Sequence, residues 1–544
     1  MAKYCNSTFG VWRMKYVKSC LLNIWNYSLA LFLGQLASFL IASLLPIGPV
    51  TAQAEPSPPG SIVQVEPAQA NWLSFVQEAE MLASPEALLD QCVRFARFNE
   101  MALGMTSETL TQEFADQPLL KTLDRLFKLR LVLRTMAGEF VSQKNSRCVD
   151  AIRTTLNEIR VLEDFVAVAY ARQQDLKQPG VLRGESPYLL VNPIYPREKD
   201  GTVQLKSGDI LLSRGNRFIS AMIAKITEPG GLFSHAAIVY VDEKTGQAYT
   251  VEAHIEIGAV VRPISAYLKP GSARVMVLRH KDSRLAHQAA QYMAERVAAI
   301  SETGENVPYD FAMRTEEHSE LFCAEVPSEA YEIASKGSVV IPTFRSRIEM
   351  KNQNYLRRLG IAVRETFSPI DMDIQSDFDV VAEWRDLEKV QATWLSDVMM
   401  SEIYRWMDEY NYTLRSTPAI NMAKWFAWSI RRTPLLKELV REKLPSNMSR
   451  SVIEVVGILD KLEKVLVPIL LAENQESLNR DGMPLTRVEL SGILEKFRIE
   501  DLDRYLTYSE FNFKYGNNPP SEGLPVLAPP LPRFHGIFRP AELP

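Results

Sequence analysis

The chain has no excess of basic charge. Its 544 residues carry 61 lysines and arginines against 66 aspartates and glutamates, which gives a net charge of −5. Nucleic-acid-binding domains have clustered basic side chains or a recognisable binding motif, and the sequence offers neither. We therefore expect no nucleic acid partner. The chain also lacks an internal repeat, so its length predicts two or three ordinary globular domains.

Charge is absent altogether between Ser19 and Ala54. Four basic residues precede this stretch, which has an apolar centre, two prolines and a small-x-small ending. This pattern is typical of a secretory signal peptide and predicts an exported chain that begins near Glu55. The alternative is an uncleaved membrane anchor, because the apolar part is long enough to span a bilayer. In both cases we expect localisation in the periplasm or cell envelope, with membrane association through residues 1–54 in the second.

Cysteine is scarce, with five residues in the whole chain. Cys5 and Cys20 fall in the N-terminal segment. Cys92 and Cys148 lie in one helical region, where they form either a disulfide or two buried thiols, and the sequence does not decide between these. Cys323 has no obvious partner. An exported free thiol is expected to be buried or used chemically.

Hydrophobic periodicity divides the remainder of the chain. Apolar residues recur at helical spacing in two regions, and between them short strand-like segments alternate with turns. The expected order is a Pro-rich linker (55–71), a helical region (72–180), an α+β block (185–386), a second helical region (387–516) and a Pro-rich disordered tail (517–544).

A histidine stands at the start of one predicted strand, in "GGLFSHAAIVY" (230–240). Read alone, His235 is a structural residue at a strand end. The next strand-like segment, "AYTVEAH", returns after a turn and carries Glu252 and His254 on one face. Depending on hairpin register, His235 falls opposite one or the other. Either could orient an imidazole and stabilise its charged form, although a solvated hairpin face with a chance pairing is the plainer interpretation.

Cys323 is the candidate nucleophile. The segment that follows it is expected to be helical, and a helix N-terminus with a nearby imidazolium favours the thiolate. Pro327 is expected to delay the start of this helix by two or three residues. The alternative for Cys323 is a small buried hydrophobic residue, the usual environment of a free cysteine.

Five segments in this order, "GDILLSRG", "FSHAAIVYV", "VEAHIEIGAVVRPISAYL", "PYDF" and "LFCAEVPSEAY", resemble the circularly permuted papain-like amidases. These are the YiiX/YaeF-like members of the NlpC-type cysteine peptidase superfamily, and the resemblance covers residues 205–331. It implies a permuted papain-like fold in which the nucleophile, general base and third polar residue match Cys323, His235 and Glu252. Tyr309 and Asp310 match the family's Tyr-Asp pair and are candidate substrate-binding residues.

The resemblance implies an exported cysteine hydrolase that cleaves an amide or ester bond through a thioester, with a cell-wall peptide or a lipid as substrate. It implies no cofactor. We also expect no metal, since "EEHSE" (316–320) reads as a polar loop. Ala324 and Pro327 depart from the family pattern beside the nucleophile. They favour the alternative, a catalytically inactive envelope module that binds lipid or peptide.

Overall fold

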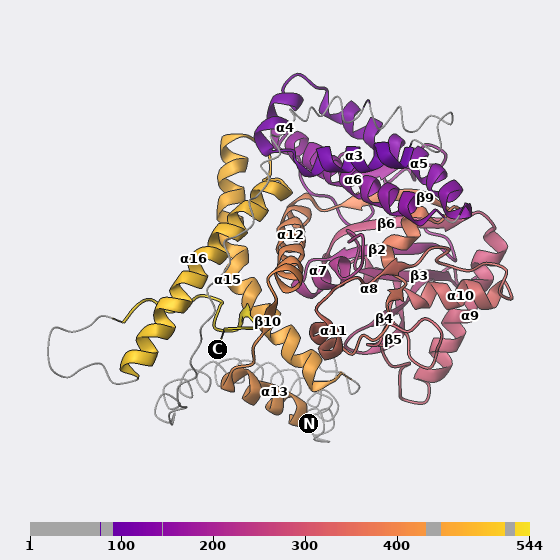
Figure 1. Ribbon diagram of the computed structural model, residues 1–544. Coiled ribbons are helices and arrows are strands. Elements are labelled where there is room, and N and C mark those ends of the chain that lie inside the picture. Colours follow the sequence, from indigo (N-terminus) through magenta and orange to yellow (C-terminus); the bar gives the residue numbers. More distant parts are fainter. Residues whose placement is uncertain (1–76, 78–90, 144, 431–447, 517–527, 544) are drawn as a thin grey trace, which may run out of the picture. The chain divides into compact units, whose positions relative to one another are not determined.

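The computed structural model describes residue 77 and residues 91–143, 145–430, 448–516 and 528–543 (Figure 1). All of them fall in the larger of the two units into which the chain divides, 67–544. The predicted signal or anchor segment and the Pro-rich linker lie outside the described residues. Within the described part, no helix combines the length and apolar character needed to cross a membrane.

A seven-stranded sheet forms the centre of the α+β block, in the order β1-β9-β6-β2-β3-β4-β5 (Figure 1). Every pairing in it is antiparallel. The strands are β1 (Leu189–Val191), β2 (Ile210–Gly215), β3 (His235–Val241), β4 (Ala248–His254), β5 (Gly258–Pro263), β6 (Ser272–His280) and β9 (Phe378–Arg385). The predicted α+β class with an antiparallel sheet and helical regions is confirmed. Strands β2 to β6 coincide with the strand-like segments of the sequence, "DILLSR", "HAAIVYV", "AYTVEAH", "AVVRPI" and "ARVMVLR", whereas β1 and β9 were not predicted.

The β3–β4 hairpin turns at Lys244 and Thr245, as the sequence indicates. Asp242 accepts the N–H of Lys244 at 2.8 Å, and Gly246 adopts a φ of 68°, which favours glycine. The resulting register pairs Ala237 with Glu252.

Alternating side chains separate two faces of the sheet. Leu212, Ile238 and Met276 belong to the core that includes the helices, whereas the neighbouring Leu211 and Val277 belong to a smaller cluster with loop residues. Helices α9 (Ser283–Ser301), α10 (Glu325–Ala334) and α12 (Leu387–Glu409) contact strands of the sheet. The larger of the two buried clusters thus lies on the face that packs against helices.

The two helical regions supply long amphipathic helices, as their periodicity predicts. The N-terminal region contains α3 (Gln91–Leu103), α4 (Ser107–Phe114), α5 (Leu119–Ser142) and α6 (Ser146–Gln173). The C-terminal region contains α12, α13 (Pro418–Ile430), α15 (Arg450–Arg480) and α16 (Arg487–Tyr515). Short helices α7 (Phe218–Lys225), α8 (Ile264–Tyr267) and α11 (Gln353–Leu359) lie between these elements in the chain.

Buried charges join the N-terminal helices to the sheet. Glu383 on β9 is fully buried, and its carboxylate lies 2.8 Å from Arg130 on α5 and 3.1 Å from Arg160 on α6. Arg274 on β6 contacts the same carboxylate. These ion pairs hold the pKa of Glu383 well below its usual range, against the effect of burial. Buried ion pairs therefore connect α5 and α6 to the sheet.

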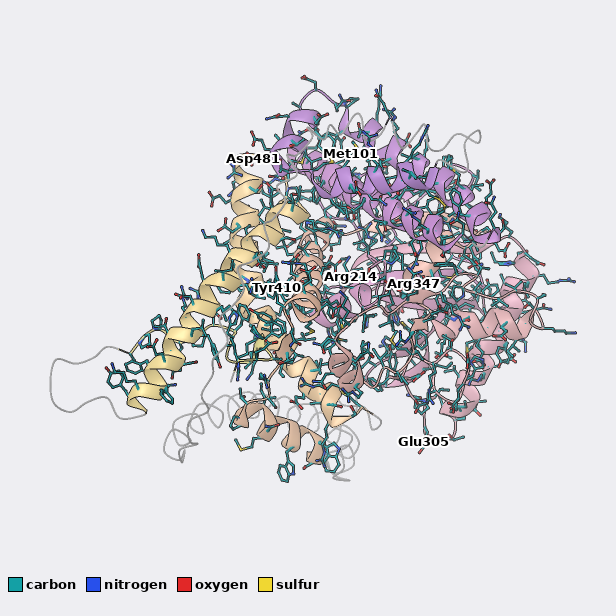
Figure 2. The ribbon with its side chains drawn as sticks, in the orientation of Figure 1. Met101, Arg214, Glu305, Arg347, Tyr410 and Asp481 are labelled. Atoms are coloured by element: carbon teal, nitrogen blue, oxygen red, sulfur yellow. A yellow bond between two sulfur atoms is a disulfide. The ribbon has the colours of Figure 1, made fainter. Side chains whose placement is uncertain are left out.

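A second buried ion pair joins the sheet to the C-terminal helices. Arg214, labelled in Figure 2, lies at the end of β2 and is buried. Its Nη2 atom lies 2.6 Å from Oδ1 of Asp397 on α12. Buried ion pairs thus fix both helical regions to the sheet.

The end of the chain differs from the expected disordered tail. From residue 528 the chain is folded, and β11 (Phe538–Pro540) pairs with β10 (Tyr412–Leu414). Phe534 and His535 are fully buried, and Asp501 accepts both of their backbone N–H groups. Aromatic burial therefore overrides the proline-rich composition, and the prediction of disorder is wrong for 528–543.

Cys92 and Cys148 form a disulfide that links α3 to α6, with their Cα atoms 4.9 Å apart. Of the two alternatives for this pair, the structure has the bridge. Among the described residues, Cys323 is the one cysteine outside it, and it is buried.

Candidate active site

Cys323 lies two residues ahead of α10, whose N-cap is Ala324. Its Sγ atom is 4.0 Å from the carbonyl oxygen of Ser234, the residue before β3. The thiol therefore meets the start of β3, where His235 begins the strand. The helix dipole at this end favours a negative charge on the sulfur.

Pro327 does not delay the helix, contrary to the expectation from sequence. Helix α10 begins at Glu325, so Pro327 is its third residue. Backbone N–H groups in a first turn have no partner within the helix, and a proline there costs little. The departure from the family pattern at this position thus leaves the nucleophile's helix in place.

His235 and Glu252 are joined across the hairpin. The register places Glu252 opposite Ala237 and diagonal to His235, and His235 Nε2 lies 2.8 Å from Glu252 Oε2. Glu252 is almost fully buried, and Thr250 donates its hydroxyl to the other carboxylate oxygen at 3.2 Å. Of the two candidates for the third residue, Glu252 makes the shorter contact with His235.

His254 contacts the same carboxylate oxygen as His235. Its Nε2 lies 3.3 Å from Glu252 Oε2, and its ring stacks on that of His235 with centroids 5.3 Å apart. A single carboxylate oxygen thus faces two imidazoles, of which His235 is the closer.

Electrostatics at the pair favour a charged imidazole. Burial alone would lower the pKa of His235, but hydrogen bonds to Cys323 and Glu252 outweigh it and raise the pKa to about 10. Burial likewise opposes ionisation of Glu252, yet hydrogen bonds to His235 and His254 hold its pKa well below the usual range. His235 is therefore protonated and Glu252 ionised at neutral pH.

The side chains of Tyr309 and Asp310 lie in different surroundings. Tyr309 lines the cleft at Cys323, and burial, with the neighbouring Cys323, raises its pKa well above the usual value. Asp310 is buried and accepts the backbone N–H groups of Ala312 and Arg314, each at 2.7 Å. Asp310 therefore fixes the loop and does not line the cleft, and its role in substrate binding stays a prediction.

Two residues that sequence reasoning missed lie at the site. Tyr267 on α8 stacks on His235 with ring centroids 6.5 Å apart, and burial raises its pKa. Glu325 lies two residues after Cys323, and its carboxylate accepts the N–H of Phe322 at 3.0 Å. Burial raises the pKa of Glu325 to about 9 despite this bond, so it is neutral at neutral pH. No local pattern marks Tyr267, because its contact with His235 depends on the tertiary fold. The bond between Glu325 and Phe322 is local, but the burial that raises the pKa of Glu325 is not.

A metal ion has one candidate position in the part of the chain that the structure describes. One ligand atom each of His235, Glu252 and His254 lies within 4.8 Å of the others. Two imidazoles and a carboxylate form a ligand set that suits zinc. Within the described residues, the "EEHSE" segment is not part of such a three-residue group. Its histidine, His318, has Nδ1 at 3.8 Å from a carboxylate oxygen of Glu329.

A cleft of about 1280 Å³ opens onto Cys323 and His235. Its wall includes the end of β4, helices α7 and α8, and the first third of α15. A small-molecule or chain-like substrate would therefore reach the thiol between the sheet and the C-terminal helices.

Comparison of this chain with models of known protein families and with curated proteins finds no match.

Proposed function

We propose that this protein is an exported cysteine hydrolase with a permuted papain-like fold, in which Cys323 is the nucleophile, His235 the base and Glu252 the orienting residue. The observation that supports this most is the convergence of these three side chains from a helix start and two strands. An imidazole between a thiol and a carboxylate is the arrangement that nucleophilic catalysis requires.

The proposed reaction begins with a thiolate–imidazolium pair. Glu252 is hydrogen-bonded to His235 Nε2 at 2.8 Å. Nδ1 is therefore the nitrogen that can interact with Cys323. The thiolate attacks the carbonyl carbon of an ester or amide, and backbone N–H groups near the start of α10 stabilise the oxyanion. His235 then donates its proton to the leaving alcohol or amine as the C–O or C–N bond breaks.

Water completes the cycle. His235, now neutral, accepts a proton from water, whose oxygen attacks the thioester carbonyl. Collapse of this second intermediate releases the carboxylic acid and restores the thiolate–imidazolium pair. An acceptor alcohol or amine in place of water would give transfer.

The uncharged N-terminal stretch supports export, and the ordered motifs of residues 205–331 support the family assignment. A cell-wall peptide and a lipid are both substrates that an envelope location would supply.

Alkylation tests the nucleophile without knowledge of the substrate. The full chain and its Cys323→Ala variant, which corrects for Cys5 and Cys20, are treated with iodoacetamide across a pH series. We expect Cys323 to react near neutral pH and His235→Ala to abolish this reactivity, because the imidazolium favours the thiolate. If Cys323 reacted only at the pH of an ordinary thiol, both in the unaltered chain and in His235→Ala, the chain would instead be an inactive binding module.

A further inference from the structure

The cleft at Cys323 has a second wall that lies outside the family-like segment. This wall is formed by α15, which contacts α7 beside the site (Figure 1). The aliphatic and aromatic side chains that the two helices contribute are Phe218, Ile219, Met222, Ile223, Ile453, Val456 and Leu459.

The α15 wall is a regular stripe. Ile453, Val456, Gly457 and Asp460 recur at helical spacing and therefore face the cleft together. The apolar part runs from Ile453 to Leu459, about 9 Å along the helix. Gly457 has no atom within 4 Å of where a side chain would begin, so its surface is open to the cleft.

Such a surface fits an aliphatic chain. Ile219, Ile223, Ile453 and Val456 are only half-buried, and covering this apolar area would be favourable. A peptide would need hydrogen-bond partners for its backbone, which aliphatic side chains do not supply.

The charged side chains of the cleft are nearly balanced in sign. Besides the His235–Glu252 pair, three cationic and three carboxylate side chains line it: Arg217, Arg262, Lys269, Glu256, Asp460 and Glu463. This balance selects against a strongly anionic head group and suits a neutral or zwitterionic one.

We propose that α7 and α15 hold the acyl chain of a lipid ester or amide with a neutral or zwitterionic head, so that its carbonyl carbon lies at Cys323. This inference rests on the proposed function and names its substrate class. Cys323 takes the acyl group as a thioester, the head group leaves with the proton of His235, and water releases the fatty acid.

Chain-length dependence tests the proposal on the full chain. Hydrolysis of the p-nitrophenyl esters of acetate, butyrate and octanoate is measured as kcat/KM. We expect kcat/KM to rise on the order of fourfold for each methylene that is fully buried in the cleft, and therefore at least about tenfold from acetate to octanoate if two or more methylenes enter it.

Gly457→Leu fills the cleft from α15, and Gly492→Leu is its matched control. Gly492 lies on α16, and it too has no atom within 4 Å of an added side chain. We expect Gly457→Leu to lower the octanoate-to-acetate ratio of kcat/KM at least about tenfold, while Gly492→Leu leaves the ratio unchanged.

The outcomes separate the two proposals. If acetate hydrolysis did not depend on Cys323, the proposed function would fail. If it depended on Cys323 but the wild-type rates were flat across chain length, or cell-wall peptides were cleaved in preference, only the acyl-chain inference would fail. The wild-type series decides this even if a variant does not fold.

Discussion

The imidazole rings of His235 and His254 stack 5.3 Å apart, at an angle of 23°. Both approach the same oxygen of Glu252, at 2.8 Å and 3.3 Å. The sequence placed Glu252 and His254 on one face and left open which of them serves His235. The geometry makes Glu252 the partner of both rings, so His254 acts on His235 through stacking and a shared carboxylate.

Substitutions in this cluster should lower kcat/KM to different extents. Glu252→Gln should keep the fold and lower kcat/KM by roughly ten- to a thousandfold, less than Cys323→Ala, because an orienting residue assists while a nucleophile is required. His254→Ala should have a far smaller effect. The measurement is kcat/KM for ester hydrolysis that depends on Cys323. If His254→Ala lowered kcat/KM strongly while Glu252→Gln left it unchanged, His254 and not Glu252 would be the orienting residue.

Activity should fall at alkaline pH as His235 loses its proton. The pKa of His235 is raised to about 10, so its contribution to the ion pair persists below that pH and is lost above it. Glu252→Gln removes one of the groups that raise this pKa. The alkaline limb of kcat/KM against pH should therefore move down by at least about one unit.

Glu243→Gln is the control for this shift, since Glu243 is an exposed carboxylate in the turn of the same hairpin. An alkaline limb that stayed in place in Glu252→Gln would mean that the carboxylate does not set the protonation of His235.

Glu325→Gln should stabilise the protein, and more so at higher pH. The folded-state pKa of Glu325 is raised to about 9, whereas an unfolded chain releases this proton near its ordinary pKa of about 4.3. Between these values the folded state holds a proton that the unfolded state does not, so stability declines as pH rises. Gln removes this loss and can still accept the N–H of Phe322.

Thermal unfolding of Glu325→Gln at pH 5 and pH 8 measures the effect, with Glu332→Gln on the same helix as control. An equal change in Tm at both pH values would show that Glu325 is ionised in the folded state.

Zinc should reversibly inhibit the proposed hydrolysis. Binding to His235, Glu252 and His254 would take the imidazole away from Cys323, and a chelator should restore activity. His254→Ala removes one ligand and should weaken inhibition by roughly tenfold or more. Magnesium, which prefers oxygen ligands, serves as the control ion. If zinc inhibited His254→Ala as strongly as the unaltered chain, its binding site would lie elsewhere.

The local part of the site could be predicted from sequence. Alternation in "HAAIVYV" and "AYTVEAH" and the turn between them determined which side chains share a face, and the observed register follows from the same turn. The disulfide between Cys92 and Cys148 stayed open, because pairing depends on how two helices approach each other.

The nonlocal part could not be predicted. Strand β1 is three residues long and joins β9 nearly 190 positions later, and its pairing carries no periodic signal. Tyr267 and the α15 wall reach the cleft through tertiary packing alone. The C-terminal strand was missed because composition indicated disorder, while burial of Phe534 and Phe538 decided the outcome.

The ion pairs of Glu383 make the family-like block dependent on its neighbours. Arg130 and Arg160 sit on helices that precede the block in the chain. Loss of one partner of a buried pair typically costs roughly 3–5 kcal/mol. Residues 185–386 grafted onto another protein would keep the contact of Glu383 with Arg274 but lose those with Arg130 and Arg160. We therefore expect this block to be less stable without α5 and α6, so that it can be transferred only together with these helices.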